Sequence, residues 1–147
     1  AQGSPPAAIN LDRRTDTLMK GVRTAIIVFA HGSSVLEANQ GVARLAEEVS
    51  RRAGCPASCA FLEMTQPDLG AAIAKSVAAG AERIVVIPYF LVMGVHVRKD
   101  LPRLIDRQRA LFPKVEILAG ASLESSPAMA EVVLDRVREA LPEGSTL

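Results

Sequence analysis

Four apolar segments rich in β-branched residues, each followed by a stretch with helical periodicity, constrain this fold more than any other feature. The segments are Val22–Ala30, Ala57–Glu63, Arg83–Phe90 and Lys114–Gly120. Their length and composition are typical of strands buried on both faces of a sheet. Parallel strands need long crossover connections, and the intervening stretches are long enough to be helices. The alternation therefore predicts a parallel sheet with helices on both faces and right-handed crossovers.

Local signals place the helices between these strands. Pro67 is expected at the first position of the second helix, and Gly80 ends that helix. Asp100 is expected to cap the third helix and Ser126 to open the fourth. The residues expected to face the core are Ala38, Val42, Leu45, Ala46, Val49, Leu69, Ile73, Val77, Leu104, Ile105, Gln108, Leu111, Ala130, Val133, Leu134, Val137 and Leu141.

The composition fits one domain of this architecture. Apolar residues make up 49% of the 147 residues, but Trp is absent and Phe and Tyr together number five, so Ala, Val, Leu and Ile must form the core. We expect an α/β fold, a three-layer, doubly wound, four-stranded parallel sheet of the flavodoxin-like kind with strand order 2-1-3-4. Residues 21–147 are assigned to this domain. Residues 1–20 lack apolar periodicity and are expected to form a flexible extension.

Charge and cysteine usage exclude several classes of function. Seventeen basic and sixteen acidic residues give a formal charge of +1, without the basic stripe or aromatic platform of a nucleic-acid-binding protein. Cys55 and Cys59 have no second pair to complete a zinc site, so we interpret them as reduced thiols in the core. No apolar run reaches the length of a membrane span, and no hydrophobic signal core begins the sequence. We expect a cytoplasmic protein that binds neither nucleic acid nor membranes.

Three side chains suited to metal or proton chemistry follow successive strands. His31 and Glu63 end the first two strands, and His96 lies in the apolar connection Leu91–Lys99 after the third. Ligands of doubly wound sheets bind at this edge, where neighbouring crossovers diverge. With order 2-1-3-4, the two histidines flank the crevice and Glu63 lies beside His31. Such a set suits a divalent ion of cobalt, iron, nickel or zinc, and it can also transfer protons.

The residues next to these three leave two interpretations open. Gly32 allows a sharp turn, and Ser33 and Ser34 can cap the next helix or contact an anion at its N-terminus. Arg98 and Lys99 can pair with substrate carboxylates or form an ordinary solvated face.

Three stretches, "FAHGSSVLEAN", "AFLEMTQPDLGAAI" and "RIVVIPYFLVMGVHVRKDLP", resemble the sirohydrochlorin chelatases of the short CbiX/SirB type. The similarity extends from about Val22 to Leu141, and the third stretch is the most specific. The resemblance implies ATP-independent insertion of Co²⁺ or Fe²⁺ into sirohydrochlorin, in cobalamin or siroheme biosynthesis. The metal ion, Ni²⁺ included, is then a substrate, and no tightly bound cofactor is expected. His31 and His96 match the metal-binding and proton-accepting histidines of the family, and Glu63 matches their acidic partner.

The resemblance also implies how the substrate and a second chain are placed. Ser34 and Val95 stand where the family often has arginine, which removes positive charge near the substrate carboxylates. A flat tetrapyrrole would lie on Leu91, Val92 and Val95, with Tyr89 adding a polar edge. Larger relatives have two such lobes, so this chain is expected to form a homodimer whose histidine-bearing rims face each other.

Two other classes of function use the same residues. A metal-storage or delivery protein would bind the ion through His31, His96 and Glu63 without turnover. A flavodoxin-like nucleotide or phosphate binder would use Gly32 and the two serines after it, but it leaves His96 unexplained.

Overall fold

A computed structural model describes residues 21–147. The elements in this part of the chain are β1 (Thr24–Ala30), α2 (Leu36–Ala53), β2 (Ala57–Phe61), α3 (Leu69–Ala78), β3 (Arg83–Pro88), α4 (Val95–Leu111), β4 (Glu116–Ala119), the 3₁₀ turn η1 (Leu123–Ser125) and α5 (Ala128–Ala140). The extension expected for residues 1–20 lies outside the described residues.

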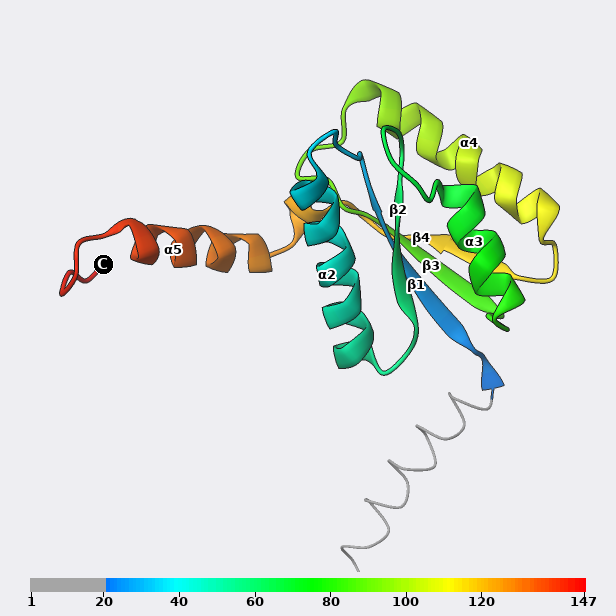
Figure 1. Cartoon of the computed structure of the whole chain (residues 1–147), viewed down its shortest axis with the longest axis horizontal. Coiled ribbons are helices and arrows are strands. Elements are labelled where there is room, and N and C mark those ends of the chain that lie inside the picture. The colour runs from blue at the N-terminus through cyan, green and yellow to red at the C-terminus, as the bar shows by residue number, and fades with distance from the viewer. Residues whose placement is uncertain (1–20) are drawn as a thin grey trace, which may run out of the picture.

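The four strands form one parallel sheet with the order β2-β1-β3-β4, which confirms the expected strand order and fold class (Figure 1). Helix α2 packs against β1 and β2, while α3 and α4 contact each other and cover the other face. This division follows from the right-handed crossovers, because the connection through α2 runs along the sheet in the opposite direction to the other two. Strand β1 lies in the interior of the sheet, between β2 and β3.

The main core lies between the sheet and the helices α3 and α4. Alternate residues of β3 show this clearly: Ile84 and Val86 are fully buried, whereas Val85 and Ile87 on the opposite face remain partly exposed. The core is aliphatic, as the composition predicts, except for Phe29, whose ring meets that of Phe90 edge to face at a centroid distance of 6.2 Å.

Two helix starts differ from the sequence prediction. Helix α4 begins at Val95, with Gly94 in extended conformation before it, so Asp100 lies inside the helix and does not cap it. Val97 and Leu101 are buried at helical spacing, and their packing extends the helix upstream of the expected cap. For α3, the Asp68 carboxylate accepts a hydrogen bond from the Ala71 amide at 2.8 Å, so Asp68 is the N-cap and Pro67 precedes the helix.

The prediction that α5 faces the core is wrong. The helix forms, but none of its residues is buried, and it extends away from the sheet (Figure 1). Within residues 21–147, the element that α5 contacts most is the neighbouring turn η1.

Cys55 and Cys59 are both free thiols, as expected, although both are half-buried and neither is a core residue. Burial raises the pKa of the Cys59 thiol, which lowers its reactivity. Among residues 21–147, no helix combines the length and hydrophobicity needed to cross a membrane.

The fold predicts a strong contrast between two apolar substitutions. Ile84→Ala removes a fully buried side chain from the interior of the sheet and should lower the free energy of unfolding by about 2–5 kcal/mol. Leu111, which the helical spacing placed toward the core, is instead 63% exposed at the end of α4, so Leu111→Ala should change it by about 0.5 kcal/mol or less. Urea denaturation of both variants measures the difference, and equal losses would contradict the described core.

Candidate functional site

Backbone pairing beyond the strand ends positions His31 and Glu63. The Leu62 amide donates to the Ala30 carbonyl at 2.9 Å, and the Glu63 amide donates to the His31 carbonyl at 3.0 Å. Backbone pairing between the two segments thus continues one residue past β1 and two residues past β2. This pairing brings the two side chains into contact, and His31 Nε2 lies 3.2 Å from Glu63 Oε1.

Gly32 makes this approach possible. Its φ of +94° is a conformation that side chains disfavour, and a Cβ atom on it would lie 1.9 Å from the Glu63 carbonyl oxygen. Only glycine therefore fits where the backbone after His31 turns against the backbone of Glu63.

The His31 ring is arranged for chemistry at Nε2. Its Nδ1 lies 3.1 Å from the Gly32 carbonyl oxygen, a partner that orients the ring when Nδ1 donates. The Nε2 atom then points toward the Glu63 carboxylate, and both side chains are more than half exposed. An imidazole and a carboxylate in this arrangement can bind a cation or exchange a proton with a ligand.

Ser33 stabilises the loop after Gly32, and neither serine caps helix α2. Ser33 Oγ accepts from the Val35 amide at 3.0 Å, and Asn39 holds the Ser33 backbone through bonds of 3.0 and 2.7 Å. Helix α2 has no side-chain cap at its N-terminus. Because the Ser33 amide is engaged by Asn39, this loop is less suited to an anion than the phosphate-binder interpretation requires.

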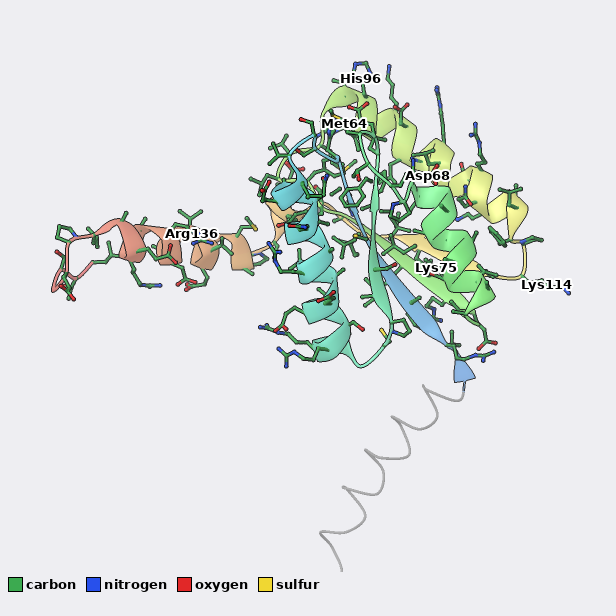
Figure 2. The ribbon with its side chains drawn as sticks, viewed as in Figure 1. Met64, Asp68, Lys75, His96, Lys114 and Arg136 are labelled. Carbon is green, nitrogen blue, oxygen red and sulfur yellow. The ribbon has the colours of Figure 1, made fainter. Side chains whose placement is uncertain are left out.

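His96 lies in the first turn of α4, not in a long loop, since only residues 89–94 connect β3 to the helix. Figure 2 shows His96 at the same end of the sheet as Met64, which follows Glu63. His31, Glu63 and His96 line one open cavity of about 550 Å³. The other lining residues are Leu62, Phe90, Val92, Gly94, Val95, Val97 and Asp100.

The three predicted ligands share the cavity without forming a compact cluster. Among residues 21–147, no three His, Cys, Asp or Glu side chains lie close enough together to hold a metal ion. His31 and Glu63 are in contact, and His96 faces the cavity from α4 apart from that pair.

Of the predicted substrate-contacting residues, two line the cavity and the others do not. Val92 and Val95 line it and are highly exposed, at 69% and 68%. The other predicted contacts, none of them a lining residue, are Ser33, Ser34, Tyr89, Leu91, Arg98 and Lys99.

Asp100 is a cavity residue that the sequence interpretation missed. It lies four residues after His96 on α4, and residues at this spacing share a helix face. If the sequence interpretation had begun this helix before His96, the four-residue spacing would have placed Asp100 on the same helix face as His96.

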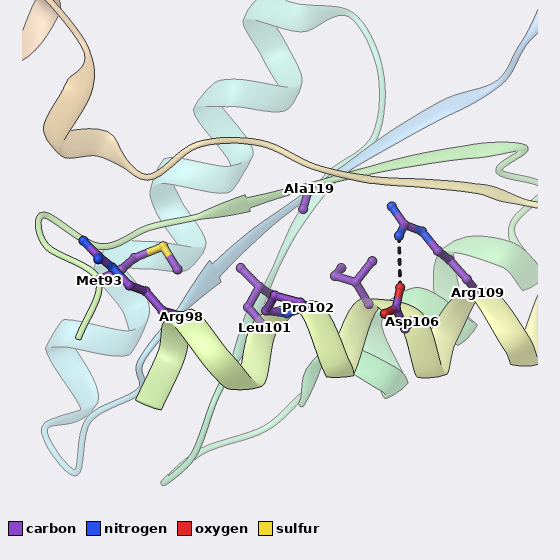
Figure 3. Close-up of a pocket in the computed structure, with 8 residues that line it drawn as sticks. Met93, Arg98, Leu101, Pro102, Asp106, Arg109 and Ala119 are labelled. Atoms are coloured by element: carbon purple, nitrogen blue, oxygen red, sulfur yellow. Dashed lines mark hydrogen bonds and ion pairs between the residues drawn. The ribbon is translucent and has the colours of Figure 1, made fainter. Parts of the chain in front are cut away.

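A second, smaller cavity of about 250 Å³ lies between α4 and the end of β4 (Figure 3). Arg98 lines it, and Arg109 bonds both the Asp106 carboxylate at 3.1 Å and the Ile117 carbonyl. The remaining lining residues are Met93, Leu101, Pro102, Ile105 and Ala119. None of the three predicted ligands lines this cavity, so the candidate site is the larger one.

Comparisons with known proteins identify the family of this chain. The family model for CbiX matches residues 25–140. The sirohydrochlorin cobaltochelatase of Methanopyrus kandleri is 29% identical over 140 residues, which cover 81% of this chain and 98% of that protein. The sirohydrochlorin ferrochelatase of Priestia megaterium is 28% identical over 117 residues, covering 78% of this chain and 44% of that protein.

A solved structure shares the fold. The sirohydrochlorin chelatase SirB from Bacillus subtilis subspecies spizizenii, in complex with cobalt, gives a TM-score of 0.73 at 27% identity. The match covers 80% of this chain and 51% of that one. This chain therefore spans about half the length of SirB and of the Priestia ferrochelatase.

Alanine substitution of Gly32, with Gly41 as the control, tests the close approach of the Gly32 backbone to the Glu63 carbonyl. Gly32→Ala should lower the free energy of unfolding by about 2 kcal/mol or more, because the new Cβ meets the Glu63 carbonyl and φ is positive. Gly41→Ala, inside α2 with open space around it, should raise it by about 0.5–1 kcal/mol. Thermal unfolding measures both, and a Gly32 variant as stable as wild type would contradict the geometry of the site.

Proposed function

The chain belongs to the CbiX family of sirohydrochlorin chelatases, and from that premise we propose that it inserts Co²⁺ or Fe²⁺ into sirohydrochlorin without ATP. The observation that carries the proposal is the contact between His31 and Glu63 in a cavity that His96 also lines. The product would enter cobalamin or siroheme biosynthesis. Metal ion and tetrapyrrole are both substrates, and no resident cofactor takes part.

Each of the three side chains has a role in this reaction. The ion is bound by His31 and His96, with Glu63 as the acidic partner of His31. Insertion of one divalent ion releases two pyrrole N–H protons from the ring, and an imidazole that holds no metal, or the Glu63 carboxylate, accepts them. The half-exposed Glu63 can pass its proton on to water.

The surface around the cavity suits a flat, acidic ligand. Val92 and Val95 give it an exposed aliphatic side, against which the ring lies, and Tyr89 and Leu91 extend that side. Ser33 and Ser34 are proposed contacts at the opposite margin, beyond His31.

Positive charge for the substrate carboxylates comes from α4. Arg98, Lys99, Arg103 and Arg107 take part in none of the ion pairs seen among residues 21–147, whereas Arg109 on the same helix is paired. Lys99 follows His96 by three residues and Arg103 follows it by seven, so they share one side of the helix with it. They compensate for the arginines that Ser34 and Val95 replace.

We also propose a homodimer in the cytoplasm, with the rims that carry His31 and His96 facing each other. The exposed Leu91, Val92 and Val95 support this assembly, because apolar side chains at one rim are costly in water. The free state of both cysteines fits a reducing compartment.

Replacing the histidines tests the assigned roles. His31→Ala and His96→Ala should each slow metal insertion at least about 100-fold, as expected for loss of a ligand or proton acceptor. Glu63→Gln should slow it less, because water can take the proton. The measurement is the absorbance change of sirohydrochlorin with Co²⁺ or Fe²⁺. Glu37→Gln on α2 is the matched carboxylate control, and histidine variants that are folded and fully active would refute the assignment.

Two separate lysine substitutions, Lys99→Ala and the control Lys114→Ala, test the role of α4 in substrate binding. Lys99→Ala should raise the KM for sirohydrochlorin about three- to tenfold with little change in kcat, because a carboxylate contact acts on the bound substrate and not on the metal. The effect should shrink at high salt. Lys114→Ala, in the connection between α4 and β4, should change neither constant. Equal effects of the two substitutions would remove Lys99 from the binding surface.

A further inference from the structure

The two histidines of the cavity are held differently. His31 Nδ1 lies 3.1 Å from the Gly32 carbonyl oxygen and His31 Nε2 lies 3.2 Å from the Glu63 carboxylate, so each ring nitrogen has an oxygen partner. Within residues 21–147, the His96 ring has no partner of this kind, although it lines the same cavity from the first turn of α4, where Figure 2 labels it. A fixed acceptor is what selects one tautomer and one orientation of an imidazole.

Asp100 supplies a carboxylate one helical turn after His96. Both residues line the cavity, and at a spacing of four residues on α4 their Cβ atoms are about 5–6 Å apart, within reach of a side-chain hydrogen bond. Asp100 is exposed and takes part in none of the ion pairs seen among residues 21–147, whereas Asp106 on the same helix pairs with Arg109 at 3.1 Å. The Asp100 carboxylate is thus available to accept a hydrogen bond from the His96 ring.

The charge around the cavity makes an unpaired carboxylate unusual there. The proposed tetrapyrrole substrate carries carboxylates of its own, and like charges across a binding surface oppose binding. Lys99 and Arg103, on the same side of α4 as His96, have the charge that suits such a substrate, but Asp100 has the opposite charge. The Asp100 carboxylate therefore does not serve the tetrapyrrole, and its effect falls on the metal ion or on a side chain that binds the ion.

A ligating histidine explains such a carboxylate. The histidine binds a metal ion through the lone pair of one ring nitrogen, while the other nitrogen keeps its hydrogen. An oxygen that accepts this N–H fixes the tautomer and the orientation of the ring, and it makes the ligating nitrogen more basic. Of the described residues that line the cavity, only Glu63 and Asp100 carry a carboxylate, and Glu63 is already in contact with His31.

We propose that Asp100 is the positioning residue of His96, and that its carboxylate accepts the ring N–H so that the other ring nitrogen faces the ion. The proposal rests on the proposed function, in which His96 is a ligand of the incoming Co²⁺ or Fe²⁺. Asp100 acts through His96 and contacts neither the ion nor the tetrapyrrole. The two histidines are then oriented by different acceptors, a backbone carbonyl for His31 and a carboxylate for His96.

Binding of Co²⁺ alone, followed by its visible absorbance in the absence of tetrapyrrole, is the first test. Asp100→Ala should raise the dissociation constant for Co²⁺ about 10- to 100-fold, the usual effect of removing the partner of a ligating histidine. Asp100→Asn should raise it less, because the amide oxygen still accepts the N–H. Asp106→Asn, on the same helix but at the smaller cavity, is the matched control and should leave it unchanged. Wild-type affinity in the Asp100→Ala variant would overturn the proposal.

Metal insertion in a His96→Ala background separates a positioning role from a direct one. In the wild-type background, Asp100→Ala should raise the KM for Co²⁺ without raising the KM for sirohydrochlorin. In the His96→Ala background, the same substitution should change either constant less than about twofold, because its effect passes through the missing ring. An equal loss in both backgrounds would show that Asp100 contacts the ion or the tetrapyrrole itself, which also overturns the proposal.

The same variants distinguish failure of this proposal from failure of the proposed function. If His96→Ala leaves the dissociation constant for Co²⁺ unchanged, His96 is not a ligand, and the proposed function is wrong in that assignment together with the role of Asp100. If His96→Ala weakens Co²⁺ binding and Asp100→Ala does not, only the positioning role is wrong.

Discussion

The parallel pairing of β1 with β2 is the constraint on which the candidate site depends. It continues past the strand ends, where the Glu63 amide bonds the His31 carbonyl. That bond requires the two backbones to approach so closely that only glycine fits at position 32. The two side chains are therefore positioned by backbone pairing that continues from the sheet into the residues just after β1 and β2. The third residue, His96, is positioned separately by the start of α4.

The sequence could predict the pairing of His31 with Glu63, because parallel strands bring their carboxyl ends to one edge and a single strand order makes them neighbours. It could not place His96 on a helix. Asp100 is a strong cap signal, and the apolar residues before it look like a loop when read locally. Tertiary packing decided the outcome, since burying Val97 and Leu101 extends the helix back to Gly94. Asp100 was missed as a cavity residue for the same reason.

The last helix shows a different limit of sequence interpretation. Apolar residues at helical spacing predict that a face of α5 becomes covered, but the same pattern arises whether the covering surface belongs to the same chain or to another. The helix itself was predicted correctly because its periodicity is local. Its position depends on how residues 120–127 leave β4, and no pattern in that segment specifies a direction.

The separation of His96 from the other two side chains bears on the choice between a chelatase and a storage protein. Structural metal sites enclose the ion with four protein ligands and hold it tightly. Here His31 and Glu63 form a pair open to solvent, and no three-ligand cluster exists within residues 21–147. An ion bound by such a pair keeps exchangeable positions, which the nitrogens of a tetrapyrrole can occupy one after another. His96, the other proposed ligand, lies on a different element of the same cavity, so the described residues do not enclose an ion. This arrangement favours transfer of the metal over its retention.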